Sequence, residues 1–285
     1  MASAKFEGVV LGLDEEQYHD HPALSSTGAR QLLEAPARFA HWQANRPPHK
    51  KAYDVGSAVH AKVLGTGADA VEIPAGVLSK SGTVGTDAAR AFIAEARAEG
   101  LIPLKADELA EVDAISEAVL AHSTARLLLE QDGHPEASVF AVDPVTGVQV
   151  RARFDFLPTG QGRRVAVDLK TKHGLATPVK FAKAVADLGY HVQDAHYIDT
   201  LGFAGFEVDA FVFLVVEKEP PYLVATYVLN PDFREIGRAR AARARDLFAH
   251  GIESGEWPGY PDQIQIARPP QWAIYDHVDT VEGER

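Results

Sequence analysis

The chain has 285 residues, 46% hydrophobic and 24% charged, with a formal net charge of −12 and no cysteine. The lack of cysteine excludes disulfide bonds and cysteine-ligated zinc or iron–sulfur centres, and it fits a reducing compartment. No stretch approaches the roughly 20 apolar residues of a membrane span, and no signal peptide is recognisable at the N-terminus, so we expect a soluble cytoplasmic protein without a membrane partner.

The first 130 residues show apolar positions at helical spacing. Ser25 or Ser26 is suited to cap the first helix, and Ala35-Pro36 should divide it, because proline disfavours a helical conformation in the residue before it. Gly, Ser and Thr are frequent over residues 65–85, which predicts a loop. The expected helices cover residues 24–44, 53–65, 86–99 and 106–130.

Beyond residue 130 the pattern changes to the alternation that is typical of strands. Three strands joined by the turns PVTG and PTGQG predict an antiparallel meander, and two helices, a strand pair and a long helix starting near Pro231 follow. The expected strands cover residues 137–143, 148–157, 163–171, 209–217 and 222–229, and the expected helices residues 177–188, 190–203 and 231–257.

This order predicts an α+β fold in which helices flank a central mixed sheet that contains the meander. Neither an internal repeat nor a clear linker is visible, so we expect a single domain over residues 1–285. Its expected parts are a helical N-terminal part (about 1–131), a core (about 132–255) and an irregular tail (256–285).

The strand VAVDLKT carries two opposite charges on one face, because Asp168 and Lys170 are two residues apart. Asp155 lies on the preceding strand, so the two carboxylates can meet at one end of the sheet. Neighbouring carboxylates repel and favour a cation between them, and hard oxygen ligands suit Mg²⁺ or Mn²⁺. Lys170 could hold or deprotonate a water molecule or stabilise a negatively charged phosphorane. The alternative is a salt-bridged strand pair without a chemical role.

Two helices add further candidates. Gln193 and Tyr197 lie four residues apart and share one helix face. His60 follows Gly56 on another helix, where glycine would let a neighbouring backbone approach closely. The alternatives are a surface helix with polar tips and a structural histidine.

Taken in order, these residues resemble the RecE-like exodeoxyribonuclease VIII group of the PDDEXK nuclease superfamily. The resemblance runs from about residue 18 to WPGY at 257–260, and it implies a PDDEXK restriction-endonuclease-like core. The superfamily often has Glu where this chain has Asp168, but Asp is common in this branch. The matching segments are YHDHPALSSTGARQLLEAPARF, Gly56 to His60, Asp155, Asp168 to Thr171, and Gln193 to Tyr197.

The resemblance implies a role for each residue, with Mg²⁺ or Mn²⁺ as cofactor. Lys170 would orient or activate the attacking water, and Gln193 and Tyr197 would support the site and touch the DNA backbone. Glu136 matches an upstream acidic position of many relatives and is expected at an outer position, next to the metal ligands but not among them. The implied metal ligands are His60, Asp155, Asp168 and the backbone carbonyl of Leu169.

The resemblance further implies a metal-dependent exonuclease that degrades linear double-stranded DNA, 5′→3′, in phage-type recombination. Such an enzyme would act on DNA ends beside a single-strand annealing recombinase and would form a homo-oligomer. The alternatives are a structure-specific or single-strand nuclease of the same superfamily, or a DNA-end-binding protein without activity.

DNA contact must be reconciled with the net charge of −12, which disfavours binding to polyanions. Lys80, in a predicted loop, could reach substrate. If the C-terminal arginines face solvent or another subunit, a path past Lys172 and Lys180 is the alternative. The last long helix carries arginines at spacings of four and seven that could follow phosphates: Arg234, Arg238 and Arg245.

Overall fold

The computed structural model describes residues 6–45, 54–275 and 277. Six strands of this part form one sheet in the order β1-β4-β5-β6-β7-β8. The meander β4-β5-β6 is antiparallel, β6 and β7 are parallel, and β7 and β8 are antiparallel, which confirms the predicted mixed sheet. The strands are β1 (Gly8–Val10), β4 (Gly133–Val142), β5 (Gln149–Pro158), β6 (Val165–Lys172), β7 (Ala210–Glu217) and β8 (Val224–Tyr227).

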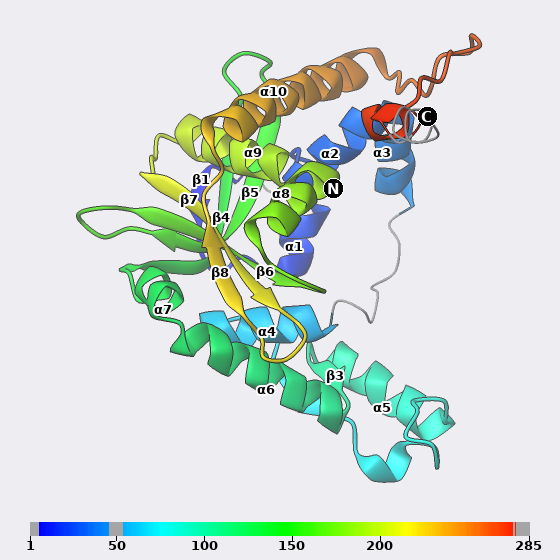
Figure 1. Ribbon diagram of the computed structural model, residues 1–285, viewed down its shortest axis with the longest axis vertical. Coiled ribbons are helices and arrows are strands. Elements are labelled where there is room, and N and C mark those ends of the chain that lie inside the picture. Colours follow the sequence, from blue (N-terminus) through cyan, green and yellow to red (C-terminus); the bar gives the residue numbers. More distant parts are fainter. Residues whose placement is uncertain (1–5, 46–53, 276, 278–285) are drawn as a thin grey trace, which may run out of the picture.

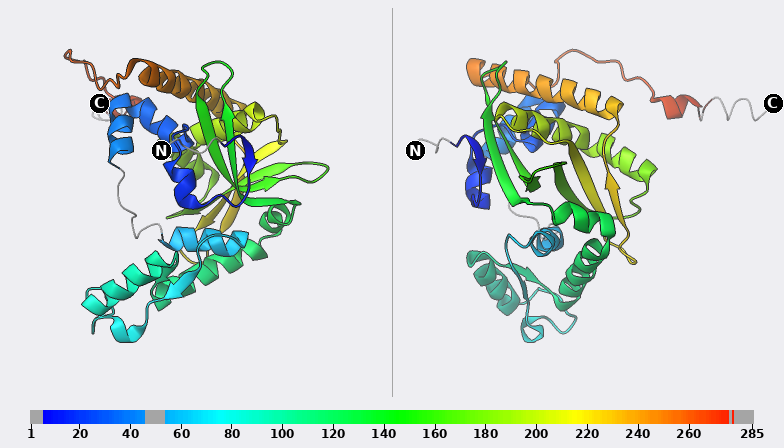
Figure 2. Two further views of the ribbon diagram at one scale, coloured as in Figure 1. Left: turned by 180° about the vertical axis from the view of Figure 1, so that it is seen from behind. Right: turned by 90° about the vertical axis from the view of Figure 1, so that its left-hand side faces the viewer.

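Helices cover both faces of this sheet, as the predicted α+β class requires (Figures 1 and 2). One face packs on α8 and α9, with α10 outside them, and the other face packs on α4 and α6. The helices are α1 (Glu15–Asp20), α2 (Ser26–Glu34), α3 (Pro36–Ala44), α4 (Asp54–Leu64), α5 (Asp87–Ala98), α6 (Ala106–Ala121), α7 (Ser123–Leu129), α8 (Pro178–Leu188), α9 (Tyr190–Phe203) and α10 (Pro231–Ser254).

Strand β6 divides its residues between the two faces. Ala166 belongs to the apolar cluster beneath α8 and α9, whereas Val167 and Leu169 belong to the cluster beneath α4 and α6. Because side chains alternate along a strand, Asp168 and Lys170 point toward the α8–α9 face. Burial on both faces explains the apolar sequence, and the two charges therefore have to find polar partners on α9.

Helix α10 is held against α9 by a close backbone approach. A Cβ atom at Gly237 would lie 2.2 Å from the carbonyl oxygen of His191, so any larger residue would force the helices apart. Asn230 caps α10, because its side-chain oxygen accepts a hydrogen bond from the backbone amide of Phe233. Pro231 occupies the first turn, where a backbone N–H would have no partner within the helix, so its absence does not destabilise the helix. The sheet, α9 and α10 thus form successive layers (Figure 2).

Several short elements were not predicted. The N-terminal segment forms β1, which pairs with β4, and then α1. The expected loop at 65–85 contains strand β2 (Ala70–Glu72) and a 3₁₀ turn (Ala75–Val77), and β2 pairs in parallel with β3 (Ile102–Leu104). Three-residue strands are too short to show an alternating pattern, so they escape sequence analysis.

Other boundaries shifted. The helix expected at 106–130 is divided at His122. The His122 side chain accepts a hydrogen bond from the backbone amide of Ala125 and thereby caps the start of α7. In the tail, residues 271–275 are helical, so it is not wholly irregular. Tyr53, residue 276 and residues 278–285 lie outside the described residues. Among the described helices, none has both the length and the apolar character needed to cross a membrane.

The prediction that Arg245 contacts DNA is wrong. Its guanidinium is buried and lies 3.0 Å from a carboxylate oxygen of Asp143 and 2.9 Å from one of Asp199. Asp143 belongs to the turn between β4 and β5, and Asp199 lies on α9. Arg245 therefore ties three segments together in the interior, where it cannot reach a phosphate backbone.

We expect Arg245→Ala to lower the free energy of unfolding by about 3–5 kcal/mol, because it leaves buried carboxylates without their counter-charge. Arg243→Ala, on an exposed position of the same helix, should change it by less than about 0.5 kcal/mol. Urea denaturation of both variants measures the difference. Equal effects would show that the ion pairs add no stability.

Candidate active site

Three side chains with metal-ligating atoms converge beside the central strands. His60 comes from α4, Glu136 from β4 and Asp155 from β5, and one ligand atom of each lies within 4.8 Å of the others. The Nδ1 atom of His60 is 3.6 Å from a carboxylate oxygen of Asp155. Gly56, one turn earlier on α4, lets that helix pass close to β6, since a Cβ there would lie 3.3 Å from the hydroxyl of Thr171.

Glu136 and Asp155 face each other because of the strand register. The pairs Pro135–Phe156 and Ala137–Phe154 flank them on either side in the antiparallel ladder of β4 and β5. Like charges in directly opposite positions are destabilising. Glu136 also has a φ of 49°, in the left-handed region that non-glycine residues rarely adopt. Such strain is typical of functional sites.

The pKa values of Glu136 and Asp155 are both raised in this arrangement. Burial raises the pKa of Glu136 to about 7, and the charge of Asp155 contributes to the rise. Burial also raises the pKa of Asp155 to about 6, while His60 opposes this rise and Asp168 adds to it. The cluster therefore contains too little positive charge for its carboxylates. Two carboxylates and an imidazole fit a divalent cation such as Mg²⁺ or Mn²⁺.

Asp155 has a second function in the structure. One of its carboxylate oxygens accepts a hydrogen bond of 2.6 Å from the backbone amide of Leu169. This bond links β5 to β6 beyond the pair Phe156–Val167, where the two strands are in register. It also fixes the carboxylate beside the cluster. The predicted role of the Leu169 carbonyl as a metal ligand stays a prediction.

Asp168 contacts residues outside this cluster. Its Oδ2 atom lies 2.5 Å from the ammonium of Lys170, and its Oδ1 atom accepts a hydrogen bond of 2.5 Å from the Gln193 amide on α9. The ammonium of Lys170 also lies 4.9 Å from the centre of the Tyr190 ring. The cluster defined above contains Glu136, which was expected at an outer position, and not Asp168, which was expected as a ligand.

The charge state of Lys170 bears on its role. Burial lowers the pKa of this lysine, but the carboxylates of Asp168 and Asp155 outweigh burial and hold the pKa above its ordinary value. Lys170 therefore remains an ammonium at neutral pH. An ammonium can donate hydrogen bonds and stabilise negative charge, but it cannot accept a proton from water.

Gln193 and Tyr197 lie together on α9, as their spacing predicts, but both are buried. Gln193 holds Asp168, and the Tyr197 ring packs 5.0 Å from that of Phe154 in the core. Burial raises the pKa of Tyr197 well above its ordinary value. Both side chains thus face the interior of the fold, and their support of the site and contact with a DNA backbone stay predictions.

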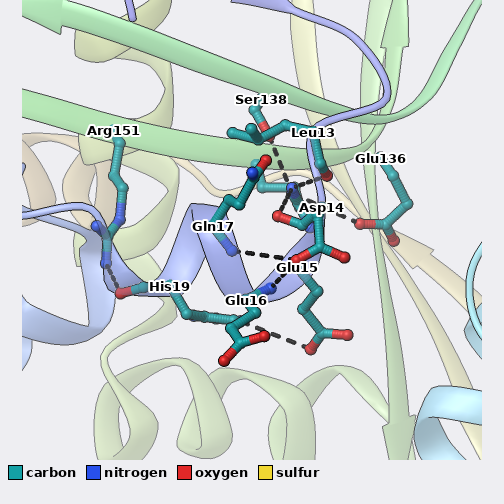
Figure 3. A network of polar contacts seen from close by, with 10 residues as sticks. Leu13, Asp14, Glu15, Glu16, Gln17, His19, Glu136, Ser138 and Arg151 are labelled. Carbon is teal, nitrogen blue, oxygen red and sulfur yellow. Dashed lines mark hydrogen bonds and ion pairs between the residues drawn. The ribbon is translucent and has the colours of Figure 1, made fainter. Parts of the chain in front are cut away.

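Arg153 is a residue beside the cluster that sequence analysis missed. Figure 3 labels its partners Leu13, Ser138 and Glu136. The Arg153 guanidinium lies 4.0 Å from Glu136, donates at 3.0 Å to the Ser138 hydroxyl and at 2.6 Å to the Leu13 carbonyl, and lies 4.4 Å from the centre of the Tyr18 ring. It thereby joins the segment before α1 to the cluster. Its place two residues before Asp155, on the same polar face of β5, was the available signal.

The remaining DNA-binding candidates lie apart from this cluster. Helix α10, with Arg234 and Arg238, lies on the outer side of α9 (Figure 2), and it packs on the sheet at the hairpin end of β4 and β5. Both arginines oppose the rise in pKa that burial causes in Asp194, which reaches about 6. Lys80 is exposed, between β2 and α5. DNA contact by these three residues stays a prediction.

Comparison with known proteins gives one family. The family model described as "PDDEXK-like domain of unknown function (DUF3799)" matches residues 25–270. No curated protein matches the sequence. The crystal structure of a "putative exonuclease" from Eubacterium rectale is similar with a TM-score of 0.58 and 13% identity, over 93% of this chain and 98% of that one, which supports the fold. The structure of SSO0001 is 11% identical, over 80% and 95% of the two chains, but its TM-score of 0.29 carries no argument.

The raised pKa values predict how the metal-free protein responds to pH. Between about pH 4.5 and 7 these two carboxyls bind more protons in the folded than in the unfolded state, so their contribution to the free energy of unfolding should fall as pH rises, by on the order of 2 kcal/mol. The pKa of His196, which burial lowers to about 4, acts in the opposite direction, so the contribution of the cluster is the difference between wild type and a variant of it. Urea denaturation in chelator at pH 5 and 7.5 measures this. Mg²⁺ or Mn²⁺ should restore most stability at pH 7.5.

A pair of variants tests whether this pH dependence comes from the cluster. Glu136→Gln should flatten it, whereas Glu235→Gln, on an exposed position of α10, should leave it unchanged. The same pH dependence in both variants would mean that Glu136 does not carry a raised pKa.

Proposed function

The chain belongs to the PDDEXK-like domain family of unknown function DUF3799, and on this basis we propose that it is a divalent-metal-dependent nuclease acting on DNA. One observation carries the proposal. The metal-ligating cluster of His60, Glu136 and Asp155 lies next to the ion pair of the buried Asp168 and the half-buried Lys170, and the carboxylates and the lysine come from the neighbouring strands β4, β5 and β6. In metal-dependent hydrolysis of a phosphodiester the cation activates water, and a further positive charge close to it stabilises the charge that develops on the phosphate.

His60, Glu136 and Asp155 would hold the ion, and Asp168 remains the proposed further ligand, with the Leu169 carbonyl. A bound Mg²⁺ or Mn²⁺ would lower the pKa of a water molecule bound to it and would place positive charge near the phosphate oxygens. Arg153 would keep Glu136 in place, since its guanidinium is also anchored to Ser138 and Leu13.

Lys170 would act through its charge. Because its pKa is held above the ordinary value, it donates hydrogen bonds to the attacking water or to a phosphate oxygen and stabilises negative charge as it develops. Asp168 orients this ammonium, and Gln193 in turn fixes Asp168 from α9. We therefore propose the lysine as a stabiliser of charge.

We further propose the narrower assignment to the RecE-like group, with 5′→3′ degradation of linear duplex DNA in phage-type recombination. The order of motifs from residue 18 to residue 260 supports it, as does the similarity to a structure described as an exonuclease. The proposal includes action as one domain, a homo-oligomer around DNA ends and an annealing recombinase as partner.

A digestion experiment tests the activity and its type. With Mg²⁺ or Mn²⁺, end-labelled linear duplex should be shortened while closed circular duplex stays intact, and excess chelator should abolish the reaction because the cluster offers ligands for a hard cation. Ca²⁺ should bind without supporting turnover. Cleavage of circular or single-stranded DNA would favour another nuclease of the superfamily, and binding without cleavage would favour an end-binding protein. Full activity in chelator would contradict the metal mechanism.

The role of Lys170 can be tested separately. Lys170→Ala should reduce the cleavage rate at least about a hundredfold, the scale for a lost group that stabilises transition-state charge. Metal binding should persist, because the three clustered ligands remain. The matched control is Lys105→Ala. It also removes a lysine that is paired with an aspartate, Asp107, but this pair is 65 residues away from Lys170 in the sequence. Normal cleavage by a folded Lys170→Ala would leave the lysine as a structural ion pair only.

A further inference from the structure

A pocket of about 450 Å³ opens at the C-terminal end of β6. It lies between the end of that strand, the start of the following segment and helix α8, and the ring of Tyr190 on α9 forms part of its wall. Lys170 lines it as well, so the pocket and the candidate active site share this residue. The lysines that line it are Lys170, Lys172, Lys180 and Lys183.

The concentration of lysine here is unusual for this chain. The sequence has eleven lysines and a net charge of −12, yet four of the eleven line this one pocket. Among the described residues that line it, the acidic one is Asp187. The uneven distribution of charge that DNA binding requires is therefore present at this place.

The state of each lysine shows which charges are free to act. Lys170 is paired with Asp168, and the ammonium of Lys172 donates to the carbonyl of His173 at 2.9 Å. Lys183 pairs with Asp187 at 2.7 Å, but both side chains are well exposed, so this pair is weak. Lys180 is exposed, and no ion pair of it is found among the described residues.

We propose that this pocket binds the backbone phosphate of a nucleotide next to the scissile bond, and that Lys180 and Lys183 are the residues that contact it. The inference rests on the proposed nuclease function. Lysine binds phosphate as a point charge, and a phosphate held at Lys180 and Lys183 would lead the strand directly to Lys170. A volume of this size suits one nucleotide of one strand rather than a duplex.

This location fits better than the C-terminal helix on which the arginines lie. Helix α10 packs on α9 and on the hairpin end of β4 and β5, and Arg245 is buried in ion pairs. The lysine pocket, by contrast, begins at Lys170 itself. A strand that enters here needs no rearrangement of the core to reach the site.

The test measures steady-state cleavage and binding to a linear duplex and to the same strand unpaired, with Ca²⁺ in place of Mg²⁺ for binding. Lys180→Ala with Lys183→Ala should raise KM about tenfold and leave kcat within about twofold. The slope of log affinity against log salt should flatten by about 0.7 to 0.9 for each lost phosphate contact. A change in kcat alone, or an unchanged slope, would overturn the proposal.

Two further variants sharpen the test. Asp187→Asn removes the acid that competes for Lys183, so it should tighten binding about twofold to fivefold, opposite in sign to the lysine variants. Lys105→Gln changes the net charge by the same amount as one lysine variant, outside the pocket, and should change neither KM nor the slope. The single variant Lys180→Gln, which changes the net charge by the same amount, should raise KM and flatten the slope. An equal effect of Lys105→Gln would reduce the role of the pocket to net charge and overturn the proposal.

Free nucleotide and inorganic phosphate serve as competitors to identify the source of the bound phosphate. If the double variant loses inhibition by both but binds DNA with an unchanged slope, the pocket holds a released product and the proposal for the strand is wrong. Wild-type protein that neither binds nor cuts DNA would instead remove the proposed function. Wild-type cleavage with unaffected lysine variants would remove this inference alone.

Discussion

The repulsion between Glu136 and Asp155 is the constraint on which the rest of the site depends. The register of β4 and β5 places the two carboxylates opposite each other, and burial denies them the solvent that would screen them. A sheet selected only for stability would not keep this pair, nor a glutamate with a φ of 49°. Both features are explained if folding leaves a cation site that binding completes.

The surrounding elements limit the cost of this repulsion without removing it. His60 approaches Asp155 from α4, the Leu169 amide donates to the same carboxylate, and Arg153 lies near Glu136 while it anchors the segment before α1. None of these contacts is a tight ion pair to Glu136. The contrast with Asp168 is clear, because the ammonium of Lys170 lies 2.5 Å from one of its oxygens and Gln193 donates to the other. Glu136 and Asp155 have no counter-charge as close as the one that Lys170 gives to Asp168.

The sequence was most informative where a pattern is long or a spacing is local. The meander, the helices α8 and α9 and the placement of Asp168 and Lys170 on one face all follow from periodicity. Partner choice is different, since it depends on side-chain rotamers and on register between segments. That is why Glu136 was expected at an outer position and Arg245 on a DNA-facing stripe, although the register across β4 and β5 and the burial of α10 decide otherwise.

Charge distribution is the last link between the fold and the proposed function. An acidic chain resists DNA at a distance, so a basic region must be compact and close to the chemistry to be useful. The parallel connection from β6 through α8 meets this need, because it returns along the sheet directly after β6. Residues that follow Lys170 in sequence thus line a pocket that begins at Lys170 in space. The same strand end that positions the proposed active-site lysine also starts the basic pocket proposed to receive a phosphate.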